Sequence, residues 1–454
     1  MMVKWLKTSA HKLYYRSPIF FQHVMTSVYG FKLRKERYND HYKKTFHRLV
    51  DGAIDHEKQL LLFMQHLKQN VPYYKHIHID ETRPFDSFRQ LPHTNKSDLR
   101  NELDRRSHKD GVLRVSRTSG TTGKNLIVYN SEFDRAERMA YLDYLKYKNG
   151  VLPFSKRASF TGQELTPQSH GNVLWRYNAP MNQMLYATYY INMNNIKNVY
   201  RSLAHFRPVS LDGYPSAIHM VAKYILSKDL TIDWEVKAVF PNAETLLPQA
   251  REDIEKAFNT KVIDQYASAE GAPFIYSDKN GRYYVGHETG LIEFEKNNHG
   301  TYEMVVTSFI NYATPIVRYR IGDQVEIDSD QSYLNSYTDD VVIKKIIGRQ
   351  SDYLLGEQDN RVNSVNMAWV VDGLEESIIQ IQFIQKSRTR FEVNMVVEKD
   401  FCEADEKLLK KRMHRRLGKN NRYDFIYRDA IKKERSGKVR FIINEMSDRS
   451  HIEK

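Results

Sequence analysis

A strand, a helix and a second strand follow one another between residues 236 and 266, and this order restricts the fold more than any other feature of the sequence. Val236–Phe240 is strand-like, Thr245–Thr260 has the pattern of a helix, and Lys261–Tyr266 is strand-like again. The expected helix carries one apolar stripe, made of Ala250, Ile254, Ala257 and Phe258. Strands joined by a helix through short connections pair in parallel, so the sequence predicts a parallel sheet.

The pattern of elements elsewhere indicates a mixed α/β chain. A second helix is predicted over Pro215–Ser227, with a proline in its first turn, where the missing N–H costs little. From Thr301 onward short strands take over, and residues 280–347 are predicted to be rich in β-structure. The expected strands of this portion are Tyr302–Thr307, Ile316–Tyr319 and Val325–Ile327.

A domain boundary is predicted at Gly348–Asp352. Before it lies a large domain, residues 1–347, and after it a small domain, residues 348–454. The small domain is predicted to be α+β, because it has its own strands and a basic helix that Gly418 closes. These elements are Ile378–Ile384, Phe391–Val397 and a helix near Ala404–Leu417. A chain of 454 residues is long enough for two domains.

The composition restricts the class of protein and the kinds of molecule that this chain can bind. Hydrophobic residues make up 41% of the chain, enough to bury a large core, so we expect a folded globular protein. The net charge is +13, but the basic residues are scattered and no zinc-finger, RNA-recognition or basic-zipper signature is present, so no nucleic-acid partner is predicted. The single cysteine, Cys402, excludes an internal disulfide and suits a reducing cytoplasm.

Ser17–Phe31 is the most apolar stretch near the start of the chain. It falls short of the roughly 18 to 20 apolar residues that a membrane span requires, and it carries Gln22 and His23. Basic residues between Lys4 and Lys35 flank it, so it could lie on an anionic membrane surface or pack against the main domain. We therefore expect a cytoplasmic protein, with weak peripheral association at the inner face of the membrane as an open alternative.

A loop of small, hydroxylated and cationic residues, Thr118–Lys124, stands directly before the apolar run Leu126–Tyr129. Consecutive small residues let backbone N–H groups converge on an anion, hydroxyl groups add donors, and Lys124 adds a charge. A tight turn into a strand would explain the same residues. The loop is not a Walker A sequence, because Thr118 and Asn125 stand where that motif needs Gly and Ser or Thr.

Three further clusters could hold parts of a nucleotide. Tyr266–Gly271 follows a predicted parallel strand, where a ring can stack on a base and a carboxylate can hold Mg²⁺. Arg318–Asp323 closes a strand with an acid that could accept hydrogen bonds from ribose hydroxyls, and Arg349 offers another donor. Glu434–Arg440 places a lysine in a flexible loop before a strand at Val439–Ile443. Strand caps, surface ion pairs and a basic tail are the structural alternatives.

Together and in this order, these segments resemble the adenylate-forming superfamily of acyl-CoA synthetases, and within it the phenylacetate-CoA ligase branch and its CapK-like proteins, which are linked to capsular polysaccharide synthesis. The resemblance covers nearly the whole chain, and VLWRYN (Val173–Asn178) with YYINMNN (Tyr189–Asn195) indicates the CapK-like side. The other matching segments are NVPYYK (Asn70–Lys75), LPHTNKSDLR (Leu91–Arg100), RTSGTTGK (Arg117–Lys124), LDGYPSAI (Leu211–Ile218), NAETL (Asn242–Leu246), DQYASAE (Asp264–Glu270), TPIVRYRIGD (Thr314–Asp323), GRQSD (Gly348–Asp352) and SGKVR (Ser436–Arg440).

The resemblance implies a large adenylate-forming domain, a small mobile C-terminal domain and a role for each matching residue. The loop residues Thr118, Ser119, Gly120, Thr121, Thr122, Gly123 and Lys124 would hold the phosphates of ATP. Asn242, Ala243, Glu244 and Tyr266 would line the adenine. Glu270 would ligate Mg²⁺, and Asp323 would hold the ribose with help from Arg349. Lys438 would come over on the small domain and bridge the acid and the α-phosphate.

The implied activity is ATP-dependent conversion of a carboxylic acid to an acyl-adenylate with release of pyrophosphate, followed by acyl transfer to CoA or another acceptor. Transfer of AMP itself, or a nucleotide-binding scaffold with little turnover, are the alternatives. Ala267 and Ala269 replace a usual glycine and a hydroxyl residue, and Ser351 replaces the usual hinge acid, which comes one residue later as Asp352. Gly356–Arg361 replaces a glycine-rich stretch that often touches CoA, so ATP binding is better supported than transfer to CoA.

Overall fold

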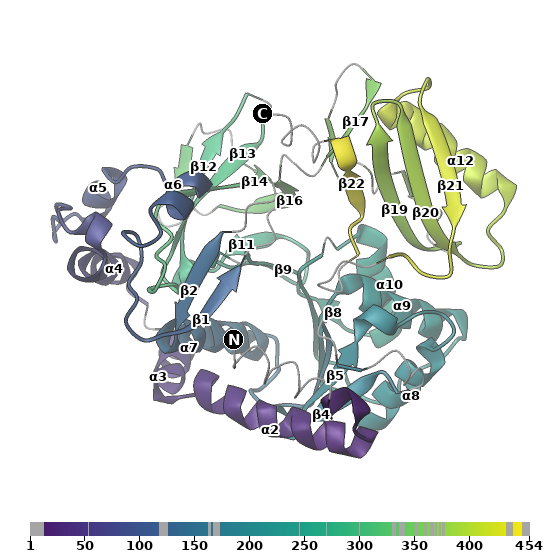
Figure 1. Ribbon diagram of the computed structural model, residues 1–454, viewed down its shortest axis with the longest axis horizontal. Helices are drawn as coiled ribbons and strands as arrows, with labels where there is room; N and C mark the ends of the chain where they lie inside the picture. Colours follow the sequence, from purple (N-terminus) through teal and green to yellow (C-terminus); the bar gives the residue numbers. More distant parts are fainter. Residues whose placement is uncertain are drawn as a thin grey trace. The chain divides into compact units, whose positions relative to one another are not determined.

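The computed structural model describes residues 13–52, 54–117, 126–161, 165–166, 173–244, 246–268, 270–298, 300–328, 333–335, 341–349, 353–357, 361–363, 367, 370–371, 374, 377–432 and 439–446 (Figure 1). The chain divides into two compact units. Unit 1 comprises Met1–Lys35, Asn149–Asp264 and Asp352–Ser450, and unit 2 comprises Glu36–Lys148, Gln265–Ser351 and His451–Lys454.

Unit 1 contains a six-stranded sheet whose strand order is β4-β5-β3-β6-β7-β8. All neighbours pair in parallel except the edge strand β4, which is antiparallel to β5. The strands are β3 (Arg157–Thr161), β4 (Trp175–Asn178), β5 (Gln183–Ala187), β6 (Ser210–Gly213), β7 (Ala238–Pro241) and β8 (Lys261–Val262). Three helices bury apolar faces in the same core, α8 (Ile196–Phe206), α9 (Pro215–Ser227) and α10 (Pro248–Phe258). The helix α2 (Ile19–Arg37) contacts β4 of this sheet.

The predicted strand-helix-strand unit is confirmed, with one correction. Helix α9 has the predicted bounds, α10 lies inside its predicted range, and β7 pairs in parallel with β8. The prediction of one strand over Lys261–Tyr266 was wrong, because β8 ends at Val262. Gln265–Tyr266 forms a separate strand, β9, which belongs to unit 2 and pairs antiparallel with β10 (Ile275–Ser277). Residues 261–266 therefore contribute strands to two different sheets.

The C-terminal part of unit 1 has a four-stranded sheet in the order β21-β20-β19-β22 and a hydrophobic core of its own. Helix α12 (Glu403–Leu417) runs along this sheet and buries Leu409, Met413 and Leu417 in that core (Figure 1). The strands are β19 (Ile378–Ser387), β20 (Arg390–Val397), β21 (Arg422–Tyr427) and β22 (Ile442–Asn444), with a separate pair formed by β17 (Tyr353–Leu355) and β18 (Arg361–Asn363). The predicted strands Ile378–Ile384 and Phe391–Val397 and the basic helix are confirmed, whereas the strand predicted over Val439–Ile443 begins only at Ile442. Movement of residues 348–454 as a domain stays a prediction.

Unit 2 is built on an antiparallel eight-stranded sheet in the order β15-β12-β13-β14-β16-β11-β10-β9. Its further strands are β11 (Tyr283–Val285), β12 (Gly290–Lys296), β13 (Tyr302–Ser308), β14 (Tyr319–Ile327), β15 (Tyr333–Asn335) and β16 (Ile343–Arg349). The helices are α3 (Asp40–Val50), α4 (His56–Asn70), α5 (Pro84–Arg89), α6 (Lys96–Asn101) and α7 (Glu132–Lys148), and β1 (Val112–Arg117) pairs with β2 (Ile127–Ser131). This sheet confirms the β-rich portion predicted over 280–347. The predicted strand Ile316–Tyr319 was wrong, because β14 begins only at Tyr319.

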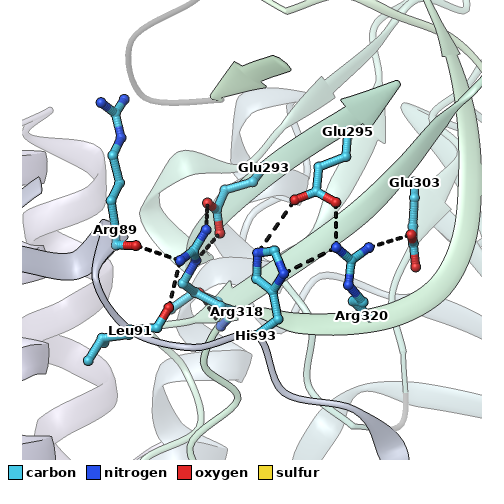
Figure 2. Close-up of polar contacts among 9 residues, drawn as sticks. Arg89, Leu91, His93, Glu293, Glu295, Glu303, Arg318 and Arg320 are labelled. Atoms are coloured by element: carbon cyan, nitrogen blue, oxygen red, sulfur yellow. Dashed lines mark hydrogen bonds and ion pairs between the residues drawn. The ribbon is translucent and has the colours of Figure 1, made fainter. Parts of the chain in front are cut away.

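A buried ion pair holds the start of β14 in place (Figure 2). Arg318 donates from Nη2 and Nε to the two carboxylate oxygens of Glu293, at 2.9 and 3.1 Å, and the Glu293 side chain is 0% exposed. The remaining terminal nitrogen donates to the carbonyl oxygens of Arg89 and Leu91 at 2.7 and 2.6 Å. The guanidinium group of Arg318, directly before β14, therefore connects this strand to β12, to the end of α5 and to the segment after α5.

A more exposed cluster lies next to this pair (Figure 2). Arg320 donates to carboxylate oxygens of Glu295 and Glu303, each at 2.6 Å, and to Nδ1 of His93 at 3.1 Å. Burial, followed by the positive charge of Arg318, lowers the pKa of His93. The ring is therefore held in its neutral form, which can accept the Arg320 hydrogen bond.

Replacing Arg318 with Met should destabilise unit 2 strongly, because it leaves the carboxylate of Glu293 buried without its cation. Removing one partner of a buried ion pair typically costs about 3–5 kcal/mol. Urea unfolding followed by circular dichroism measures the loss. Arg320→Met is the matched control, since its partners are partly exposed and its loss should be about 1 kcal/mol. Equal losses in the two variants would contradict this account of Glu293.

Candidate functional site

In unit 1, the predicted adenine residues Asn242, Ala243 and Glu244 directly follow β7, at its carboxyl end. This end lies beside the end of β6, since Pro241 is opposite Gly213 and the Asn242 N–H donates to the Gly213 carbonyl at 2.9 Å. Ala243 has φ of 69°, in the left-handed region. A non-glycine residue held there costs of order 1–3 kcal/mol, and such residues cluster at ligand sites. Carboxyl ends of parallel strands are also where open α/β sheets bind ligands.

Gly213 makes the sharp turn from β6 into α9. Its φ is +120°, and a Cβ added there would lie 1.9 Å from the carbonyl oxygen of Phe160. Only glycine fits this position, which explains its place in the segment Leu211–Ile218. The turn brings the N-terminus of α9, with its positive end of the helix dipole, to the same edge of the sheet as Ala243.

The carboxylate of Glu244 joins three segments of unit 1. One oxygen accepts the backbone N–H of Ser216, in the first turn of α9, at 3.2 Å. The other accepts the backbone N–H of Val439 at 2.8 Å. Val439 follows Lys438, so the chain next to the predicted catalytic lysine is bonded to the predicted adenine loop. Lys438 itself lies outside the described residues.

Other contacts in unit 1 support this arrangement of the C-terminal part. Lys223 on α9 donates from Nζ to the Ile378 carbonyl at 2.8 Å, and its side chain is mostly buried. The side chain of Gln380 donates to Sδ of Met220 at 3.3 Å. The apolar side chains Ile379, Val396 and Ile431 are buried in the same core as α9. The C-terminal sheet of unit 1 therefore packs against α9 in this structure.

In unit 2, the predicted ribose and adenine residues lie together. The Tyr266 hydroxyl donates to Oδ2 of Asp323 at 2.5 Å, and Asp323 is buried. Asp323 does not close a strand, as the sequence predicted, but lies within β14. There it is directly opposite Arg349 of β16, so the two residues assigned to the ribose are neighbours across the sheet. The side chain of Arg349 lies outside the described residues.

Glu270, the predicted magnesium ligand, has a buried side chain. Its backbone is held by Asn311, whose Nδ2 donates to the Glu270 carbonyl at 3.1 Å. Carboxylate oxygen is the ligand type that Mg²⁺ prefers, usually one or two carboxylates together with substrate phosphates. Among the described residues there is no group of three or more His, Cys, Asp or Glu side chains that could hold a metal on their own. The donor chemistry of Glu270 thus fits a metal shared with a nucleotide.

Two supporting residues were not found from the sequence. Asn311 has no sequence signal, because its role depends on a contact 41 residues away. Asp134 accepts the backbone N–H groups of Tyr312 and Ala313 at 2.6 and 3.2 Å, so it fixes the loop that contains Asn311. Burial raises the pKa of Asp134. The sequence does carry a signal for Asp134, because Ser131 and Asp134 have the spacing of a helix capping box. In the structure they make both hydrogen bonds of that box.

The predicted phosphate loop, with Thr118, Ser119, Gly120, Thr121, Thr122, Gly123 and Lys124, lies outside the described residues. Its two ends are adjacent, because Arg117 at the end of β1 is opposite Ile127 at the start of β2. The strand predicted after the loop is therefore confirmed.

In the part of the chain that the structure describes, no helix is both long and apolar enough to cross a membrane.

Comparisons with known proteins agree with the geometry. The family model of the CapK C-terminal domain matches residues 354–445. Protein CapK of Staphylococcus aureus is 35% identical over 450 residues, which is 96% of this chain and 99% of that protein. Two crystal structures of 2-hydroxyisobutyryl-CoA ligase in the postadenylation state, one with R3-HIB-AMP and one with 2-HIB-AMP, each align with a TM-score of 0.63 at 15% identity, over 87% of this chain and 90% of the other.

The identity to CapK is high and extends along almost the whole length of both chains, whereas the likeness to the ligase structures concerns the fold alone. The chain belongs to the CapK family, and it has the fold of the adenylate-forming CoA ligases.

Proposed function

We propose that this protein uses ATP to convert a carboxylic acid to an acyl-adenylate, with release of pyrophosphate, and then transfers the acyl group to CoA or another acceptor. The observation that carries the proposal is the position of Asp323, hydrogen-bonded to Tyr266 and opposite Arg349. The bound adenylates named for the 2-hydroxyisobutyryl-CoA ligase structures support the same reaction class. The family relation to CapK supports a setting in capsular or exopolysaccharide synthesis.

Residues of each unit have an expected part in binding the nucleotide. In unit 2, Asp323 would accept hydrogen bonds from the ribose hydroxyls, with Arg349 beside it and the Tyr266 ring against the adenine. In unit 1, the backbone of Asn242–Glu244 would line the adenine. The strained Ala243 supports this role, because a conformation that costs energy persists only where the surroundings fix it.

The chemical difficulty is that a carboxylate must attack the α-phosphorus, so that two anions meet. The N–H and hydroxyl groups of Ser119–Lys124 would hold the β- and γ-phosphates, and the ammonium of Lys438 would lie between the acid and the α-phosphate. Glu270 would hold Mg²⁺, whose charge would offset that of the phosphate oxygens. Each of these groups stabilises charge where it develops in the transition state.

Residues expected near the phosphates and near CoA depart from the family pattern. Ala269 lacks the hydroxyl that the family usually has, and Gly356–Arg361 lacks the usual glycines near CoA. Because of these departures, two other functions stand beside acyl transfer. One is an adenylyltransferase that leaves AMP on its substrate, and the other is a nucleotide-binding scaffold. Pyrophosphate exchange with a panel of carboxylic acids separates them: exchange that depends on the acid supports acyl-adenylate formation, whereas ATP binding without exchange favours the scaffold. AMP retained on the product, detected by mass spectrometry, favours the adenylyltransferase.

Asp323→Ala should weaken ATP binding by about 10- to 100-fold. The reason is that hydrogen bonds to a charged group contribute about 1.5–3 kcal/mol, and 1.4 kcal/mol corresponds to tenfold in affinity. Isothermal titration calorimetry measures the change. Glu326→Ala is the control, because it removes a half-exposed carboxylate from the same strand and should leave affinity unchanged. Unchanged affinity in the Asp323 variant would remove this residue from the ATP site.

Lys438→Ala should slow adenylation by about 100- to 1000-fold while ATP affinity stays almost unchanged. A group that interacts only in the transition state contributes to rate and not to ground-state binding, and removing one such electrostatic contact typically has this effect. Single-turnover formation of acyl-adenylate measures the rate. Lys432→Ala, an exposed lysine in the same segment, is the control.

Transfer from chemically supplied acyl-adenylate should be spared in the Lys438 variant, because the small domain would have moved the lysine away by that step. Adenylation at the wild-type rate would show that Lys438 is not the catalytic lysine. Loss of ATP binding would instead make Lys438 part of a static pocket.

A further inference from the structure

Helix α2 exposes large apolar side chains to solvent along one face. At about 100° per residue, Phe20, Val24, Val28 and Phe31 fall on the same side of the helix. Their exposed fractions are 70%, 44%, 63% and 63%, and Phe21 and Tyr29 are also more than half exposed. An isolated exposed apolar residue needs no explanation, but a continuous stripe of this length is typical of an interaction surface.

The opposite face of α2 is the one that packs against the protein, and it does so with polar and small residues. Gln22 is fully buried and accepts a hydrogen bond from Nε of Arg176 in β4 at 2.7 Å. The ring of His23 accepts the Tyr177 N–H at 2.7 Å. At Gly30 the helix approaches so closely that a Cβ would lie 1.9 Å from Oδ1 of Asn178. Helices of globular proteins normally bury the apolar face, so α2 is oriented the other way round.

The charge around the stripe indicates what covers it. Residues 1–37 contain eight Lys and Arg residues and one acidic residue, Glu36, which pairs with Arg135. Lys32 and Lys35 are exposed near the C-terminal end of the stripe. Phe and Val side chains flanked by basic residues are the pattern of a helix that lies in the plane of an anionic lipid surface. A second copy packed through the same face about a two-fold axis would instead bring like charges together.

We propose that α2 docks this protein on an anionic membrane surface. The stripe of Phe20, Val24, Val28 and Phe31 enters the boundary between headgroups and acyl chains, and Lys32 and Lys35 face the lipid phosphates. The helix lies on the membrane and does not cross it, in agreement with its charge and length. The proposal concerns location and is independent of the adenylation reaction.

Flotation of the full-length protein with phosphatidylcholine vesicles, with and without phosphatidylglycerol, tests this surface. Binding is expected to the anionic vesicles only and should fade at high salt, because salt screens charges near the surface. The double variant Phe20→Ser/Phe31→Ser should lower the partition coefficient at least about tenfold, since binding scales with buried apolar area. Lys35→Glu should lower it by about fivefold or more, since each basic residue near the surface contributes about this factor.

Leu408→Ser is the matched control, because Leu408 is 37% exposed on α12, a helix of the same unit that packs on the C-terminal sheet, and this variant should bind as the wild type does. All of these positions are exposed, and a thermal melt verifies that the variants fold. The proposal is overturned if the wild type does not bind at low salt, or if the double variant binds equally well. It is also overturned if vesicles are not bound and sedimentation shows a dimer that the double variant dissociates, because α2 would then be an interface between copies.

Discussion

The contact between Arg318 and Glu293 is the interaction on which unit 2 depends. Glu293 lies in the middle of β12 with no exposure to solvent, so its charge is tolerable only beside a cation. Arg318 meets that need and uses its remaining donors on the carbonyl groups of Arg89 and Leu91. Asp323 lies five residues further along the chain, so the pair also fixes the strand that carries the proposed ribose ligand. The arginine of a structural ion pair and the proposed ribose ligand thus stand in one motif, TPIVRYRIGD.

Unit 1 is organised around a different carboxylate. Glu244 accepts N–H groups from Ser216 and from Val439, and only the second of these belongs to the C-terminal part of the chain. If the small domain moves as we propose, the Val439 contact breaks and the Ser216 contact remains. The adenine loop would then keep its anchor on α9 in both poses, while Lys438 would approach or leave with Val439. The Glu244 carboxylate would therefore hold the adenine loop in both poses. Its contact with Val439 would form only in the closed pose of the small domain.

The sequence predicted those parts of the fold in which local pattern and tertiary structure agree. Helix α9 was predicted with the correct bounds because Pro215 starts it and its apolar periodicity is regular. The apolar run Lys261–Tyr266 was misread as one strand, because periodicity cannot show that its two ends belong to different sheets. Asp323 and Arg349 were paired by family resemblance, and the antiparallel register of β14 and β16 places them opposite each other. The bond from Val439 to Glu244 spans 195 residues, and no local pattern could have indicated it.

The orientation of α2 also bears on how a membrane-docked enzyme would reach its substrates. The helix packs on β4, the edge strand of the parallel sheet, whereas Gly213 ends β6 and Asn242 follows β7. Three and four strand spacings of about 4.8 Å separate these strands from β4, so Gly213 lies about 14 Å and the proposed adenine loop about 19 Å from the docking edge. A lipid surface that contacts α2 would therefore leave the carboxyl ends of β6 and β7 uncovered. ATP could then enter from the aqueous side of a docked protein.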